Sequence, residues 1–213
     1  MKEILLDIET LEIGGKTYIW EFCGIDTKTG EVFHLLNSSA INTAIDVLEG
    51  GFNVKYFGDK QLEYISSHKI HSLSCCKFFM AIQRLLLGYT KVVAYNVNFD
   101  KGKLIEAGLK FTNNTKFVCL WGSFVNALLD KNYVVWCIAN GFKSKTGLPT
   151  TNAETAYKYV TGKVEYIHQH TALSDCLSEL VIYEAIKKKR KKLASSASYS
   201  NVQKKIKELV NFP

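Results

Sequence analysis

The chain has 213 residues, of which 47% are hydrophobic and 22% charged, and its formal net charge is +7 at pH 7. This composition excludes an intrinsically disordered chain and is typical of a soluble globular domain with its own core. No apolar run in the sequence reaches the ~18–20 residues that a membrane-spanning helix needs, and the excess of basic residues favours a polyanionic partner, with nucleic acid first and an anionic membrane surface second.

The N-terminal sequence predicts the cellular compartment. Acidic residues occur within the first ten positions and the apolar run there is short, so we expect no secretory signal peptide. Without secretion, the six cysteines are expected to be reduced thiols. We therefore expect a cytoplasmic protein, acting either in its own cell or in the cytoplasm of a virus-infected host cell.

The chain opens on an apolar run from Ile4 to Thr10 that predicts a central strand buried on both faces. Because side chains alternate along a strand, Asp7 and Glu9 should emerge on the same face. Two carboxylates so placed repel each other unless a cation lies between them, and their hard oxygen atoms suit Mg²⁺ or Mn²⁺. The alternative interpretation is a strand end whose acids face solvent.

Further strands and helices are predicted up to the middle of the chain. Residues 16–26 and 31–36 are rich in β-branched and aromatic side chains and form an antiparallel pair joined by a hairpin turn. Helices are predicted over residues 41–48 and 73–87, and a fourth strand over residues 92–96. The segment between the two helices is polar and weakly periodic, so we predict no element there.

The second half of the chain alternates strand and helix signals. Asp100 precedes a helix predicted over residues 101–107, and a fifth strand follows at residues 117–121. An Asp at a strand–helix junction is commonly a helix N-cap, but strand ends in an open α/β sheet are also where ligands bind. Residues 141–151 contain glycines, lysines and a proline and predict an exposed basic loop.

The last long helix is expected to begin near His170 and Asp175. These residues are five positions apart. In an α-helix of 3.6 residues per turn, that spacing separates the two side chains by about 140°, so they would not share a face. His170 is therefore expected in the entry loop rather than inside the helix. The helix runs into six consecutive basic residues, 187–192, which form either a solvated helix end or a phosphate-contacting patch.

The boundaries of the chain's parts follow from composition. We predict one domain over residues 1–192 and, over residues 193–213, a Ser- and Ala-rich linker with a short amphipathic helix from Val202 to Val210. That helix either packs back on the domain or contacts a partner.

Three motifs in a fixed order resemble a known family. They are Asp7-x-Glu9-Thr10, Asn96-x-x-Phe99-Asp100 and His170-x4-Asp175. Together they resemble the DEDDh exonucleases, the DnaQ-like family, and in particular its phage-encoded single-domain members. The resemblance implies a ribonuclease-H-like α/β fold with a mixed five-stranded sheet flanked by helices. The chain departs from the family pattern at Tyr95, where a His is usual, and in a longer stretch over residues 133–166.

The resemblance also implies roles for individual residues. Two Mg²⁺ or Mn²⁺ ions would be held by Asp7, Glu9, Asp100 and Asp175, with His170 as the general base that takes a proton from the attacking water. The terminal nucleotide would be held by the backbone at Thr10 and the side chains of Leu11 and Phe99, with Asn96 as a candidate polar contact. Upstream phosphates would be held by basic residues such as Lys101, Lys103, Lys143 and Lys145.

The implied activity is metal-dependent 3′→5′ exonucleolytic hydrolysis of DNA, single-stranded first, with release of nucleoside monophosphates. One alternative is an exoribonuclease or oligoribonuclease that acts on RNA or short oligonucleotides. A second alternative is a non-catalytic nucleic-acid-binding subunit on the same fold. In each of these three candidate functions the partner is a nucleic acid, bound at its 3′ end or along a strand, and not a membrane. The basic C-terminal segment is a candidate contact for a replication partner.

Overall fold

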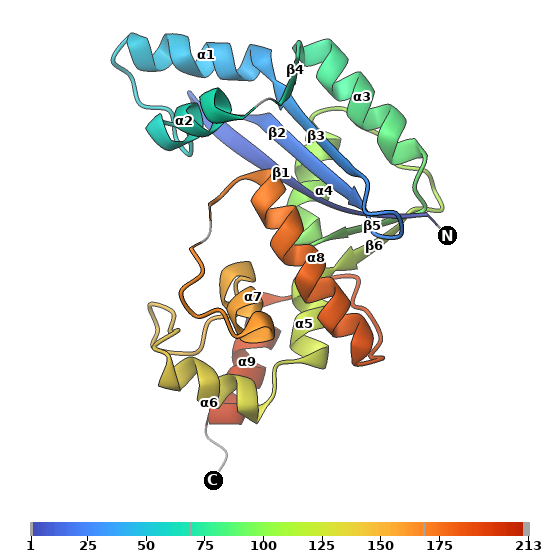
Figure 1. The fold of residues 1–213 in the computed structure, drawn as a ribbon, viewed down its shortest axis with the longest axis vertical. Coiled ribbons are helices and arrows are strands. Elements are labelled where there is room, and N and C mark those ends of the chain that lie inside the picture. The colour runs from blue at the N-terminus through green and yellow to red at the C-terminus, as the bar shows by residue number, and fades with distance from the viewer. Residues whose placement is uncertain (1, 69, 168, 211–213) are drawn as a thin grey trace.

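A six-stranded mixed sheet flanked by helices organises the chain, so the fold is α/β as predicted (Figure 1). The computed structural model describes residues 2–68, 70–167 and 169–210. Residues 1, 69, 168 and 211–213, which belong to the predicted segments 1–192 and 193–213, lie outside the described residues.

The sheet has the strand order β4-β3-β2-β1-β5-β6. Its strands are β1 (Glu3–Ile13), β2 (Lys16–Asp26), β3 (Val32–Asn37), β4 (His71–Leu73), β5 (Lys91–Ala94) and β6 (Lys116–Cys119). The first three strands pair antiparallel, whereas β5 is parallel to β1, β6 to β5, and β4 to β3. The long strand β1 is therefore central, with β2, β3 and β4 on one side and β5 and β6 on the other.

The predicted number of five strands was wrong, because β4 adds a sixth at the edge beside β3. This strand has three residues, His71, Ser72 and Leu73, and none of them is buried. A segment so short and polar carries no alternation of apolar and polar side chains, so its strand conformation depends on pairing with β3.

The helices between and after the strands have the following bounds. They are α1 (Ser38–Glu49), α2 (Asp59–Ser67), α3 (Cys75–Leu87), α4 (Val97–Glu106), α5 (Leu120–Ala127), α6 (Lys131–Ala139), α7 (Ala153–Thr161), α8 (Ala172–Lys188) and α9 (Tyr199–Val210). Among the described residues, no helix combines the length and the apolar character that crossing a lipid bilayer would require.

One helix start and one strand end differ from the predicted ones. Helix α4 begins at Val97, so Asp100 lies in its first turn and Asn96 occupies the N-cap position. The fully buried Val97 side chain anchors this start in the core. The predicted fifth strand ends at Cys119, and the two residues after it already belong to α5. Both differences arise because tertiary packing sets element ends more strongly than local propensity does.

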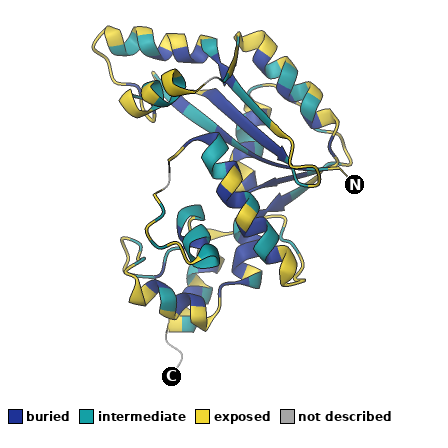
Figure 2. Cartoon of the chain, in the orientation of Figure 1, coloured by how far each residue is buried: buried dark blue, intermediate teal, exposed yellow. Residues whose placement is uncertain are grey.

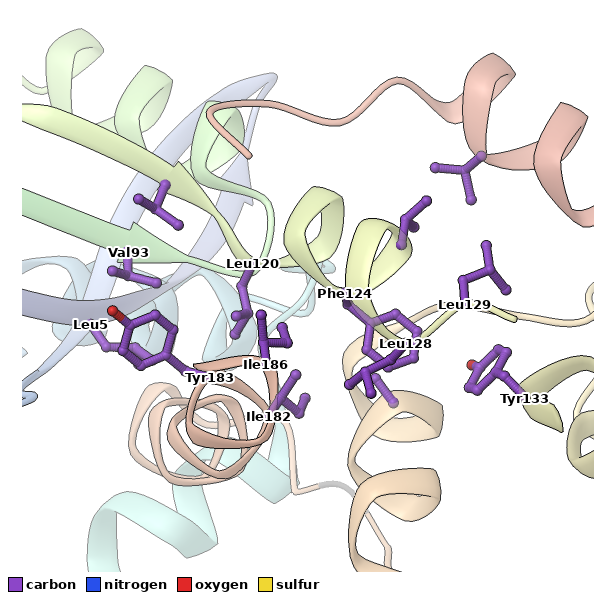
Figure 3. Packing of buried hydrophobic residues seen from close by; sticks show 14 of the residues in the cluster. Leu5, Val93, Leu120, Phe124, Leu128, Leu129, Tyr133, Ile182, Tyr183 and Ile186 are labelled. Carbon is purple, nitrogen blue, oxygen red and sulfur yellow. The ribbon is translucent and has the colours of Figure 1, made fainter. Parts of the chain in front are cut away.

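Buried apolar side chains fill both faces of the sheet, while the outward helix faces are exposed (Figure 2). On one face, Leu5 and Val93 of the sheet pack in the same cluster as Ile182 and Ile186 of α8, which crosses the sheet (Figure 3). Figure 3 shows this cluster continuing through Phe124 of α5 toward the other helices. Helix α8 is thus held against the middle of the sheet by apolar burial.

The C-terminal segment packs on the domain rather than extending from it. In α9, Val202 and Ile206 are buried in the same core cluster as α5 and α8. The preceding segment is hydrogen-bonded to the domain, because the Cys119 N–H donates to the Ala194 carbonyl at 2.8 Å and the Ala194 N–H donates to Ser123 Oγ at 2.9 Å. The apolar face of this helix is therefore occupied by the protein's own core.

Candidate metal centre

Strand β1 carries the first two acids of the centre. Asp7 and Glu9 alternate with the buried Ile8 and point to the face that α8 covers. A β-bulge follows at once, since Glu9 pairs with Glu21 but Thr10 pairs with Ile19. Such bulges increase the local twist of a strand and often redirect side chains beside functional sites.

Helix α8 carries the third acid. Its N-cap is Thr171, whose side chain accepts a hydrogen bond from the Ser174 N–H, and Asp175 lies in the first turn. One carboxylate oxygen from each of Asp7, Glu9 and Asp175 lies within 4.8 Å of the other two. Residues more than 160 positions apart in the chain are therefore brought to one point by the packing of α8 across β1.

Asp100 enters the same region from α4. Its side chain is buried, with a residue exposure of 4%, and its Oδ1 atom has no hydrogen-bond partner among the described residues. The same holds for Oδ2 of Asp7. The negative charge of Asp100 is one cause of the raised pKa of Asp7, so the two carboxylates lie near each other.

Burial and mutual repulsion raise the pKa values of the acids in the centre. For Asp7 the largest cause is loss of hydration, followed by the charge of Asp100, and its pKa is well above the usual range. Burial, followed by the charge of Asp175, raises the pKa of Glu9 to about 9. Burial likewise raises the pKa of Asp100 to about 7, although hydrogen bonds with the backbone of Asp100 and Ile8 oppose the shift. Without a positive charge nearby, the ionised acids are destabilised.

The donor set fits a divalent cation with a preference for oxygen. Every ligand atom is a carboxylate oxygen, the type that Mg²⁺ and Mn²⁺ prefer. Among the described residues, no lysine, arginine or histidine forms an ion pair with Asp7, Glu9 or Asp100. Buried carboxylate oxygens that no protein group satisfies are what metal ligation would account for.

The raised pKa values predict how the metal-free protein responds to pH. In EDTA, stability should fall as pH rises from 5 to 9, because Glu9 and Asp100 bind protons in the folded state at pH values where the unfolded chain has released them. Each unit by which a folded-state pKa exceeds the unfolded one costs about 1.4 kcal/mol, or about 3–5 °C in Tm for a chain of this size. Thermal unfolding at several pH values measures this loss.

Saturating Mg²⁺ provides the control for that measurement. The cation replaces the protons as the partner of the carboxylates, so the fall in Tm between pH 5 and 9 should shrink. A metal-free Tm at pH 8 that equals or exceeds the Tm at pH 5 would contradict the electrostatic account.

Glu21 ties the beginning of α8 to the sheet beside Glu9. Its side chain is fully buried on β2, directly opposite Glu9 in the register. One carboxylate oxygen accepts a hydrogen bond from the Tyr64 hydroxyl at 2.8 Å and lies 2.7 Å from His34 Nε2. The other oxygen accepts the N–H of Ala172, the first residue of α8, at 3.0 Å. These contacts join β2, β3, α2 and α8 and fix the position of the helix that bears Asp175.

The histidine of the third motif lies in the loop before α8, as predicted. His170 is exposed and its backbone has a φ of 53°, in the left-handed region that few residues other than glycine adopt. Such a conformation persists where the surrounding structure imposes it, and it often occurs at functional sites. His170 directly precedes the N-cap Thr171, so the exposed imidazole belongs to the loop that leads into the helix bearing Asp175.

Tyr95 occupies the position where the family pattern has a histidine, and its hydroxyl is engaged elsewhere. It donates a hydrogen bond to the carbonyl of Thr151, whose own hydroxyl accepts the Trp121 Nε1–H at 2.9 Å. Tyr133 makes a similar contact through its hydroxyl with the Thr150 carbonyl at 2.7 Å. These aromatic residues hold the end of the 141–152 segment against the domain.

The four residues predicted to bind the nucleotide fall in three places. Thr10 and Phe99 line a cavity of about 410 Å³ together with Glu9 and Tyr56. Leu11 is fully buried in a different cluster, under α1, and does not line that cavity. Asn96 lines a separate cavity of about 280 Å³. The cavity next to Glu9 therefore brings together two of the four.

Sequence reasoning missed two buried acids of the centre, Glu21 and Glu179. Glu179 is 2% exposed and lies one helical turn after Asp175. Its spacing of four residues from Asp175 places both side chains on one face of α8, so this signal was available in the sequence. No comparable signal marks Glu21, because its role depends on which strands and helices lie beside it.

No family model, curated protein or solved structure matches the chain. The assignment of a function therefore depends on the chain's own residues and on how the fold arranges them.

Proposed function

We propose that this protein is a metal-dependent 3′→5′ exonuclease of the DEDDh type, built on a ribonuclease-H-like fold and acting in the cytoplasm. The observation that carries the proposal is the convergence of Asp7, Glu9 and Asp175 within 4.8 Å. The order of the three motifs along the chain supports the same class. The substrate is the 3′ end of a nucleic acid, with single-stranded DNA as the first candidate and RNA as the alternative.

Asp7, Glu9 and Asp175, together with the buried Asp100, would hold two Mg²⁺ or Mn²⁺ ions. When bound, the ions supply positive charge beside the scissile phosphate and make water easier to deprotonate. The protein keeps the carboxylates in place through β1, α4 and the apolar packing of α8. Carboxylates held in place before substrate binds need little reorganisation when it does.

His170 is the proton acceptor in this proposal. Its exposed position in the loop before α8 gives the imidazole access to both solvent and substrate. The residue takes the proton of the attacking water and then passes it to solvent.

The cavity next to Glu9 is the proposed site of the 3′-terminal nucleotide. Phe99 is 45% exposed and lines this cavity with Thr10 and Tyr56, so an aromatic face is available for a base. Stacking of a base on an aromatic side chain contributes about 1–3 kcal/mol and is tolerant of sequence. Lys103 lines the same cavity and can approach a phosphate, although it also contacts Glu106 at 2.8 Å.

A direct assay tests the proposal. Purified protein is incubated with 5′-labelled single-stranded DNA, single-stranded RNA and duplexes, each with Mg²⁺, Mn²⁺ or EDTA. A ladder of 3′-shortened products that requires the metal is the expected result, and the substrate that yields it decides between DNA and RNA. If every substrate stays intact with either metal, the protein is not an exonuclease and a nucleic-acid-binding role replaces the proposal.

A further inference from the structure

A cavity of about 1000 Å³ is lined by residues from the end of α5, from α7 and from α8, and we call it the α7–α8 groove. Helices α7 and α8 pack against each other, and α5 contacts α8 (Figure 1). The groove has more than twice the volume of the cavity of about 410 Å³ next to Glu9. Most of its wall is aliphatic and consists of Leu128, Val160, Leu180, Val181 and Ala185.

The aliphatic wall of the groove continues on the outward face of α8. Leu177 is 49% exposed and Val181 is 38% exposed. These residues are four positions apart, and Ala185 follows at the same spacing, so the three side chains lie on one face of the helix. Apolar side chains that line a groove and stay accessible on successive turns are typical of a surface that a partner covers.

Lysines lie at the C-terminal end of the same groove. Lys188 and Lys189 line it, both are exposed, and neither forms an ion pair among the described residues. The acid in the wall, Glu184, is paired with Lys187 at 3.1 Å. Lysines suit the C-terminus of any helix, but the helix dipole does not account for an aliphatic wall beside them. The groove therefore combines an apolar wall with uncompensated positive charge at one end.

This lining favours a peptide over a nucleic-acid strand. Proteins bind single strands largely by stacking bases on aromatic rings. Tyr159 is the aromatic residue in the groove wall, and its ring already makes edge contacts with Tyr133 and Trp136, at 4.9 and 5.2 Å between ring centroids. Aliphatic walls instead accept the Leu, Ile or Val side chains of an amphipathic segment, and lysines attract carboxylates.

We propose that the α7–α8 groove docks a partner protein through an acidic segment that carries aliphatic side chains. The aliphatic side chains enter the groove, and the Asp or Glu residues of the segment lie beside Lys188 and Lys189. Lys188 is about 20 Å from Asp175 along α8, at 1.5 Å per residue, so the docked segment leaves the acidic centre accessible. This inference goes beyond the proposed function and does not depend on it.

Peptide selection on the full chain tests the proposal. A display library of short random peptides is selected on the immobilised protein, and enriched peptides are synthesised with a fluorophore for anisotropy titrations. The enriched peptides should combine aliphatic residues with Asp or Glu, and their affinity should fall as salt rises. Val181→Glu should weaken binding at least ~10-fold, as loss of an apolar contact at the centre of an interface does. The double variant Lys188→Glu with Lys189→Glu should weaken it at least ~10-fold by placing like charges opposite each other.

A second double variant controls for net charge. Lys60→Glu with Lys77→Glu changes the charge by the same amount at exposed positions of α2 and α3, outside the groove, and should keep the wild-type affinity. Thermal unfolding checks that every variant folds. If Val181→Glu does not fold, the pair at the exposed Lys188 and Lys189 carries the test by itself.

Two results would overturn the docking proposal, whatever the exonuclease assay gives. One is a set of enriched peptides that lack acidic residues or that bind the groove variants as tightly as wild type. The other comes from single-stranded oligothymidine as a competitor. If it displaces the peptides and loses affinity for the groove variants but not for the control pair, the groove binds nucleic acid instead.

Discussion

Replacement of Asp7 by Asn is expected to reduce kcat for the proposed exonuclease reaction at least ~10³-fold, which corresponds to about 4 kcal/mol of barrier. Asp7 is central to the effect because its carboxylate belongs to the cluster with Glu9 and Asp175, and its buried Oδ2 has no hydrogen-bond partner among the described residues. The amide is nearly isosteric but neutral, so the site loses a metal ligand with little change of shape. Gel assays of 3′ shortening with Mg²⁺ and with Mn²⁺ measure the loss.

Stability measurements distinguish loss of a ligand from loss of the fold in that variant. Without metal, Asp7→Asn should unfold at the same temperature as wild type or higher, because the substitution relieves repulsion among buried carboxylates. Addition of Mn²⁺ should raise the Tm of the wild-type protein more than that of the variant. Asp46→Asn, on the exposed side of α1, is the matched control and should keep wild-type activity. An Asp7→Asn enzyme with wild-type kcat would refute the metal-centre assignment.

Replacement of His170 by Asn is expected to lower kcat by ~10²–10⁴-fold, the usual contribution of a general base. Asn is the informative substitution because it tolerates the left-handed backbone, with a φ of 53°, that His170 adopts. Mn²⁺ affinity and substrate binding should be retained, since the imidazole is not among the carboxylate ligands.

His170→Ala serves as a second variant, and free imidazole in the assay should partly restore activity in both. These readouts separate a base from a residue that only shapes the loop, because a loop defect would not be rescued by imidazole. Wild-type kcat values for both variants across the pH range would show that His170 has no part in proton transfer.

Local patterns in the sequence were sufficient for the elements that alternate or repeat strongly. Strand β1 and the same-face placement of Asp7 and Glu9 followed from a period of two. The position of His170 in the loop before α8 was also predicted. The free thiol state of all six cysteines also agrees with the prediction. By contrast, β4 and α2 were missed, because their short and largely exposed segments have little periodicity of their own.

In the candidate centre, too, some features were predicted from the sequence and others depend on tertiary contacts. The motifs predicted that Asp7, Glu9 and Asp175 come together, as they do in the structure. They did not predict that Leu11 is buried under α1 or that Asn96 lines a cavity apart from Phe99. They also did not identify Glu21, whose three hydrogen-bond partners come from β3, α2 and α8. Contacts of this kind join residues that are distant in the chain, so no local pattern encodes them.

The sequence by itself determined the chemistry available to this protein: a basic chain whose acids alternate on one strand and recur in ordered motifs. Only the tertiary structure decided where those acids meet, because their convergence depends on the packing of α8 across β1 and on the entry of α4 from the end of β5. The physical reason is the separation along the chain over which each kind of interaction acts. Backbone periodicity acts over a few residues, whereas burial and charge repulsion in the centre act between side chains from opposite ends of the chain.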